Sequence, residues 1–158
     1  MATQWTAQGI TSGAVLPAAT LQSIGAAWET WTPTLSSWTL GNGTLTGRYT
    51  RINKFVNVEI TLTIGSTSNT AALGPILSLP ITPRTGNIGA FSWFGTAQDV
   101  SAGTQYPMSA WPVGASSLYP VTLGSAGAYI NSYYTSNTSP MTWATGDVLY
   151  LQGIYEAA

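Results

Sequence analysis

Apolar and polar residues alternate with a period of two through much of the chain after residue 38. Such alternation places successive side chains on opposite faces of a β-strand, one face buried and one solvated. Residues 44–52 alternate less sharply, with Leu45 and Tyr49 on one face, and Asn53-Lys54 separates them from the next run. The pattern predicts a β-hairpin over residues 44–64. The clearest run is 55–64, whose alternating apolar positions are Val56, Val58, Ile60, Leu62 and Ile64.

The remainder of the chain continues in short β-like runs separated by turn signals. Gly41-Asn42-Gly43 and Gly146-Asp147 are such signals. Many short strands with turns every eight to twelve residues are typical of an all-β fold. We therefore predict an antiparallel β-sandwich, jelly-roll-like, as one domain over residues 34–158. The predicted strands after the hairpin are 76–79, 88–94, 106–111, 118–123, 128–134 and 148–155.

Residues 1–33 have a different pattern and are predicted to form an N-terminal arm followed by one short helix. Within residues 14–31 the large apolar residues are Leu21, Ile24, Trp28 and Trp31, at steps of three, four and three. That spacing is the seam of a coiled coil. It favours a short homotrimeric bundle that also attaches the subunit to a larger particle. The alternative is an amphipathic helix that packs on its own domain.

The composition combines a normal apolar content with very little charge. Apolar residues make up 44% of the chain, charged residues only 6%, and the net charge is −1. A typical soluble domain has about 25% charged residues. Near-zero net charge removes the self-repulsion that keeps monomers apart, so the surface suits a permanent assembly. An ordinary neutral domain is the alternative.

The residue inventory removes most kinds of catalytic chemistry. Histidine and cysteine are absent, which excludes Ser-His-Asp hydrolysis, thiolate chemistry and His- or Cys-ligated metals. A glycosidase needs only two carboxylates, and Glu59 with Asp99 is the one plausible pair. Their surroundings give neither a special role, so we expect no catalytic residue, no cofactor and no metal.

Nucleic acid and membrane are also not expected as partners. The four cations are Arg48, Arg51, Lys54 and Arg84, and the first three do not fall on one face of a strand as phosphate binding would require. No stretch reaches the roughly 18 apolar residues of a membrane-spanning helix. The N-terminus lacks the basic start of a secretory signal, so we expect synthesis in a cytoplasm.

Aromatic residues are the remaining resource for recognition. The chain has seven Trp and eight Tyr but only three Phe. Trp and Tyr combine a flat apolar face with a polar tip and are frequent at interfaces. They are candidates for contact with a glycan or a protein partner, and the alternative is that they fill the core or a subunit contact. The candidates are Trp93, Tyr106, Trp111, Tyr119, Tyr133 and Tyr134.

Two stretches of the sequence resemble a known kind of module. They are WETWTPTLSSWTLGNGTLTGRYTRINKFVNVEITLTIGSTS at residues 28–68 and PMTWATGDVLYLQGIYEAA at the C-terminus. The chain resembles minor tail and fibre-like virion proteins of phages that infect actinobacteria. The resemblance implies a β-sandwich domain in a virion, commonly a trimer, without catalytic residues. The motifs that carry it are Trp31-Thr-Pro-Thr, Gly41-Asn-Gly-Thr, Tyr49-Thr-Arg, Trp143 with Gly146-Asp147, and Gly153-Ile-Tyr155.

The expected function is therefore that of a phage virion protein, a tail-fibre or spike-like adhesin that contacts host surface glycans as a homotrimer. Its N-terminal arm would bind other virion structural proteins. One alternative is a capsid or tail decoration protein with a purely structural role. A glycan-active enzyme that uses Glu59 and Asp99 is the third possibility.

Overall fold

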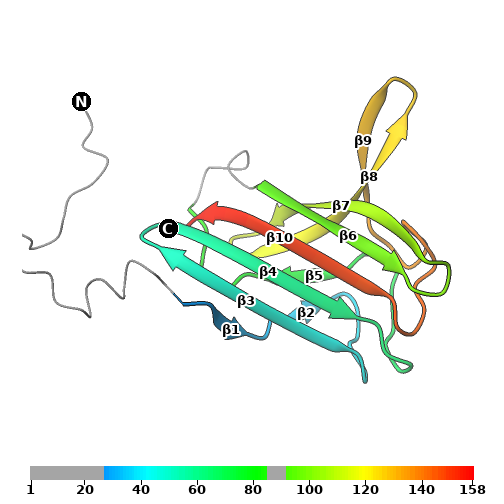
Figure 1. The fold of residues 1–158 in the computed structure, drawn as a ribbon, viewed down its shortest axis with the longest axis horizontal. Helices are drawn as coiled ribbons and strands as arrows, with labels where there is room; N and C mark the ends of the chain where they lie inside the picture. Colours follow the sequence, from blue (N-terminus) through cyan, green and yellow to red (C-terminus); the bar gives the residue numbers. More distant parts are fainter. Residues whose placement is uncertain (1–26, 85–91) are drawn as a thin grey trace, which may run out of the picture.

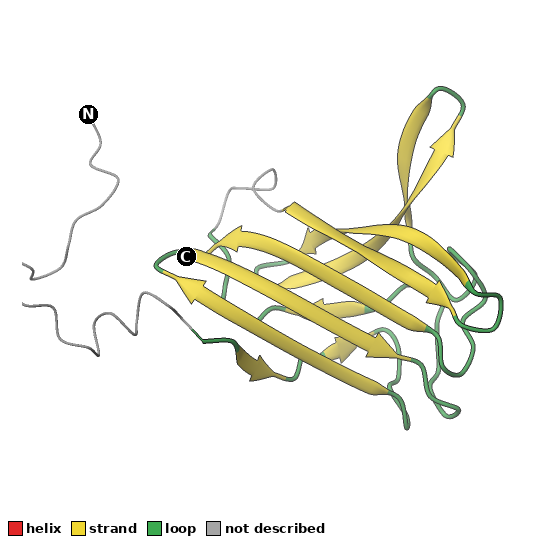
Figure 2. Cartoon of the chain, in the orientation of Figure 1, coloured by secondary structure: helices red, strands yellow, loops and turns green. Residues whose placement is uncertain are grey.

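The computed structural model describes residues 27–84 and 92–158. Within these ranges the chain forms strands and loops, with no helix (Figure 2). Every strand pair is antiparallel, and the strands join into one sheet in the order β1-β3-β4-β10-β6-β7-β8-β5-β2, with β9 paired to β8. The strands are β1 Glu29–Trp31, β2 Leu35–Ser36, β3 Thr44–Ile52, β4 Phe55–Thr63, β5 Ile76–Ser78, β6 Ser92–Asp99, β7 Thr104–Val113, β8 Ser117–Ala126, β9 Tyr129–Tyr134 and β10 Val148–Glu156.

The sheet curls so that its two halves face each other. Strands β3, β4, β10 and β6 make the front layer in Figure 1, while β7, β8, β5 and β2 curve behind them. The prediction of an all-β, antiparallel fold is confirmed. The chain forms one curled sheet, a half-barrel, where the sequence predicted the two separate sheets of a sandwich.

The core fills the space between the two halves. The inward side chains of β4 and β10 are almost fully buried, and they pack with Leu77, Met108 and Leu118 from the layer behind. The strict alternation predicted for residues 55–64 is confirmed, because β4 buries every second residue from Val56 to Leu62. The hairpin turn is also as predicted, with Asn53 in the left-handed region at φ 55°.

Two tryptophans attach the long loops to this core. Trp38 and Trp143 meet edge to face with ring centroids 5.3 Å apart. The Trp38 Nε1 donates to the carbonyl oxygen of Leu73 at 2.8 Å, and the Trp143 Nε1 donates to that of Ser136 at 3.0 Å. Each indole therefore buries its ring while its polar atom is satisfied by a loop carbonyl.

The N-terminal helix prediction is wrong in its last turn. Residues 29–31 form strand β1, in which Glu29 pairs with Tyr49 and Trp31 pairs with Gly47. The Trp31 ring covers Gly47 so closely that an added Cβ would lie 2.4 Å from it. Trp28 lies under the guanidinium of Arg48, 4.7 Å from ring centroid to Cζ.

This strand changes both the predicted stripe and the predicted domain boundary. Trp28 and Trp31 contact the sheet. The hydrogen bonds of β1 with β3, and the packing of the Trp31 ring on Gly47, stabilise a strand here although the apolar residues have helical spacing. Leu21 and Ile24 lie outside the described residues. The boundary at residue 33 falls after β1, so the main sheet begins at Glu29.

Most other predicted strands are present with shifted ends. Strand β6 starts at Ser92 and continues to Asp99, whereas the pattern predicted 88–94, of which 88–91 lie outside the described residues. Strands β7, β8 and β10 are each longer than predicted. Backbone hydrogen bonds between neighbouring strands continue past the residues whose side chains alternate between apolar and polar, so the strands are longer than the alternation predicts.

Replacing Val58 with Asp should unfold the domain. Val58 is 0% exposed at the centre of β4, and an unpaired buried carboxylate costs more than about 4 kcal/mol. We expect loss of the cooperative thermal transition measured by circular dichroism. Thr46→Asp, on the exposed face of neighbouring β3, is the matched control and should unfold like the wild type. A soluble, cooperatively folding Val58→Asp variant would contradict the assigned inward face.

Candidate functional site

The six predicted recognition aromatics divide into an inward and an outward group. Trp93 and Tyr119 are buried, and Tyr106 is half-buried against the core. These three match the alternative interpretation, in which the aromatics fill the core. The other three are exposed, at 42% for Trp111, 45% for Tyr133 and 63% for Tyr134. The recognition interpretation therefore rests on the outward group.

Trp111, Tyr119 and Tyr134 form one aromatic cluster on the outer face of β7, β8 and β9. Tyr134 stands edge to face against both neighbours, with ring centroids 5.3 Å from Trp111 and 5.0 Å from Tyr119. Trp111 and Tyr119 are cross-strand partners. The buried Tyr119 ring supports two exposed rings, so the aromatic cluster presents apolar surface in a fixed orientation.

The Tyr119 hydroxyl anchors the aromatic cluster to two loops. Its oxygen accepts a hydrogen bond from the backbone N–H of Gly74 at 2.7 Å and donates to the carbonyl oxygen of Thr135 at 2.9 Å. Both bonds are buried. The residues around Gly74 and Thr135 thereby cover the outer face of β8, which explains why Tyr119 is buried.

The outer half of the β8–β9 hairpin projects from the body of the protein. Pairing between β7 and β8 ends at Met108 and Thr122, whereas β8 remains paired with β9 as far as Ala126 and Tyr129. Figure 1 shows this hairpin rising away from the sheet, at the end remote from β1. Tyr129 and Ile130 at its tip are highly exposed. A projecting hairpin with apolar side chains is an accessible contact element.

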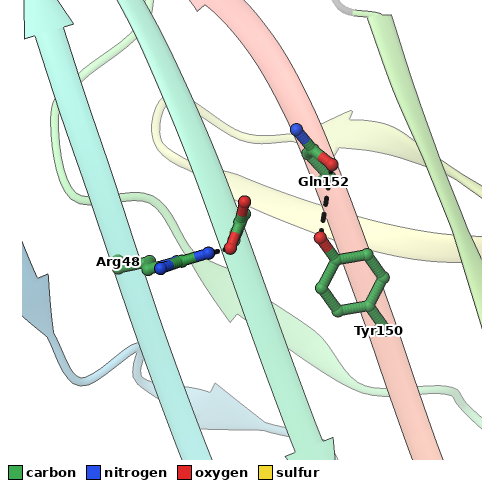
Figure 3. A network of polar contacts seen from close by, with 4 residues as sticks. Arg48, Tyr150 and Gln152 are labelled. Carbon is green, nitrogen blue, oxygen red and sulfur yellow. Dashed lines mark hydrogen bonds and ion pairs between the residues drawn. The ribbon is translucent and has the colours of Figure 1, made fainter. Parts of the chain in front are cut away.

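A polar network occupies the middle of the outer face of the front layer. Arg48 on β3 forms an ion pair with Glu59 on β4, and the hydroxyl of Tyr150 donates to the side-chain oxygen of Gln152 at 3.2 Å (Figure 3). The hydrogen bond to Glu59 raises the pKa of Arg48, and burial raises the pKa of Tyr150. Both groups keep their protons at neutral pH. An ion pair that is exposed to solvent in this way contributes little to the stability of the fold.

The carboxylates considered for glycosidase chemistry lie far apart. Glu59 pairs with Gln152, which pairs with Phe94, and Asp99 stands five residues further along β6. At about 3.3 Å per residue the separation along the strand is about 16 Å, beyond the roughly 5–10 Å that glycosidases use. Asp99 instead accepts from the Ala102 N–H and the Ser101 hydroxyl, which lowers its pKa.

Asp147 has a structural role in the turn before β10. It is buried, and its two carboxylate oxygens accept from the backbone N–H groups of Val100 at 3.0 Å and Ala144 at 2.7 Å. The carboxylate thus ties the β6–β7 turn to the turn before β10, as expected for an Asp in a Gly-Asp turn. In residues 27–84 and 92–158 no three metal-ligating side chains come together, and no helix could cross a membrane.

No family model, curated protein or solved structure matches this chain. The resemblance to phage tail and fibre-like proteins therefore stays a prediction from the sequence motifs.

The structure also exposes apolar residues that were not singled out as candidates. Ile52, Phe55, Phe94 and Ile154 are between 49% and 67% exposed, on the outer face of the front layer. We call this set the apolar patch. A signal existed in the sequence, because Phe55 occupies the outward, otherwise polar phase of the 55–64 alternation.

Removing the hydroxyl of Tyr119 should destabilise the protein measurably. Tyr119→Phe leaves a buried N–H and a buried carbonyl without this partner, which costs about 1–3 kcal/mol. For a domain of this size each kcal/mol lowers Tm by about 2–4 °C. Tyr133→Phe is the matched control, because this ring is exposed, and it should stay within about 0.5 kcal/mol of the wild type. Equal thermal stability of both variants would show that Tyr119 does not anchor the loops.

Proposed function

We propose that this chain is a non-enzymatic structural protein of a phage particle that contacts host surface glycans. The observation that supports the proposal best is the aromatic cluster, in which Tyr119 fixes the exposed rings of Trp111 and Tyr134 beside a projecting hairpin. Exposed aromatics held by a buried base are costly to leave in water and are typical of binding surfaces.

The chemistry of this surface favours a neutral ligand. Flat indole and phenol faces can lie against the apolar face of a sugar ring, and tyrosine hydroxyls can exchange hydrogen bonds with sugar hydroxyls. The nearest strands, β7, β8 and β9, contain no charged residue. A ligand recognised by charge, such as a phosphate or an acidic peptide, would find no counter-ion there. Neutral glycan is therefore the ligand class that we propose.

Assembly as a homotrimer, with the N-terminal arm attached to other virion proteins, is part of the same proposal. The low net charge permits close association of copies. Three copies of a weak sugar site on one particle raise avidity by about 10²–10⁴. The sequence resemblance points in the same direction.

A purely structural role as a capsid or tail decoration protein is the second candidate. It is favoured by the burial of Trp93 and Tyr119 and the half-burial of Tyr106, half of the predicted contact residues. The two candidates differ in one measurable property, which is whether the aromatic cluster binds sugar.

Replacing both Trp111 and Tyr134 with Ala should weaken glycan binding with little loss of stability. Binding of the purified chain to host cell-wall polysaccharide, measured by biolayer interferometry, should weaken by more than about tenfold, since truncation of a central aromatic costs about 2 kcal/mol. Phe55→Ala is the control, because it removes an exposed aromatic side chain from β4, three positions away from β7 in the order of the sheet. Unchanged binding in the double variant would favour the decoration role.

The mass of the purified chain in solution tests the proposed assembly. Light scattering should give about three times the chain mass of 16.6 kDa. A mass of one chain at micromolar concentration would contradict the homotrimer while leaving the glycan test unaffected.

A further inference from the structure

The apolar patch forms a continuous surface at one end of the front layer. Ile52 pairs with Phe55 across β3 and β4, and Ile154 lies diagonally next to both Phe55 and Phe94 in the register of β10. Diagonal neighbours on one face are about 7–8 Å apart, within reach of large side chains. These four side chains therefore expose apolar surface across four adjacent strands.

A hollow in this surface contains a polar atom that has no partner among residues 27–84 and 92–158. It is lined by Thr50, Ile52, Phe55, Asn57 and Ile154. The side-chain oxygen of Asn57 is buried and accepts no hydrogen bond from the residues that the structure describes. A buried acceptor without a donor is costly. Both the apolar walls and this acceptor would be satisfied by a chain segment that brings apolar side chains and a backbone N–H.

The chain itself enters the described structure beside the patch. Glu29 pairs with Tyr49, so Ala27 and Trp28 lie toward the Ile52 end of β3, and Trp28 covers Arg48 on the same outer face. Twenty-six residues precede Ala27. Their largest aliphatic side chains close to this point are those of Leu21 and Ile24.

The distances allow this segment to reach the whole patch. From β3 to β6 the front layer spans three inter-strand spacings, or about 14 Å. Leu21 is six residues before Ala27, and six residues extend up to about 20 Å. Only a few residues link Leu21 and Ile24 to Ala27. Because this link is short, the effective concentration of the segment at the apolar patch of its own chain is higher than that of a separate molecule.

We propose that residues 14–26 cover the apolar patch of their own chain, with Leu21 and Ile24 against Ile52, Phe55 and Ile154. A backbone N–H of the segment donates to the side-chain oxygen of Asn57. The inference is independent of glycan binding, because it involves none of the three residues of the aromatic cluster. It gives the predicted helical stripe a different partner, the domain's own outer face.

Cysteine crosslinking in the full chain tests the proposal directly, since the chain has no cysteine of its own. Ser23→Cys is combined with Thr50→Cys at the hollow and treated with a short bis-maleimide. The matched control pairs Ser23→Cys with Thr46→Cys, on the same face of β3 about 13 Å away. We expect an intrachain crosslink, identified by mass spectrometry, to form about tenfold or more faster with Thr50 than with Thr46.

Each other result of this experiment overturns the proposal. Equal rates with Thr50 and Thr46 would mean that the segment does not lie on the patch. A crosslink between two chains would mean that a neighbouring copy supplies the segment. Disulfide-linked dimers of a single Thr50→Cys variant would mean that two patches face each other.

A second measurement reads the patch itself. Leu21→Asp with Ile24→Asp should release the segment, raise the fluorescence of an apolar dye and abolish the crosslink between Ser23 and Thr50. Thr20→Asp with Gln22→Asp adds the same charge at polar positions and should change neither. Adding Phe55→Thr and Ile154→Thr to the first variant should return the dye signal to the wild-type level. Two results would overturn the proposal. One is that dye fluorescence does not rise in the Leu21→Asp, Ile24→Asp variant, and the other is that it stays high after Phe55→Thr and Ile154→Thr are added.

Discussion

The pairing of β10 between β4 and β6 is the interaction on which the rest of the structure depends. Nine consecutive residue pairs join β10 to β4, and seven join it to β6. The C-terminal strand thereby connects the first hairpin to the second half of the sheet, and its inward side chains close the core. Tyr155 holds the end of β10 in place, because its hydroxyl donates to the carbonyl oxygen of Ile81 at 2.8 Å. Burial raises the pKa of the Tyr155 hydroxyl. Without this strand the front layer would be divided.

Scarcity of charge determines what the surface can do. Arg48 is paired with Glu59 and Arg84 with Glu156, while Asp147 and Asp99 hold turns. In the part of the chain that the structure describes, these acidic groups therefore stabilise strand pairs and turns. The exposed surface consists mainly of apolar and hydroxyl groups, and tryptophan and tyrosine are side chains that combine an apolar face with a polar tip.

The two exposed apolar regions lie on adjacent strands, because the apolar patch reaches Phe94 on β6 and the aromatic cluster begins at Trp111 on β7. The β8–β9 hairpin rises at the end remote from β1 (Figure 1), whereas Ile52 and Phe55 of the apolar patch lie near the point where the chain enters the sheet. If residues 14–26 cover Ile52, Phe55 and Ile154, as proposed, the aromatic cluster is left as the accessible apolar surface.

The sequence by itself determined the all-β class and the hairpin of β3 and β4, because alternation with a period of two is a local property that burial of one face imposes on each strand. Contacts between distant parts of the chain set the edges of the sheet and which strand faces are buried. Trp28 and Trp31 have helical spacing, but Gly47, sixteen residues beyond Trp31, provides the surface on which Trp31 packs in β1. Tyr119 is buried because loops around Gly74 and Thr135 cover a face that alternation alone would leave in water. Both outcomes depend on contacts between residues distant in the chain, which no local pattern encodes.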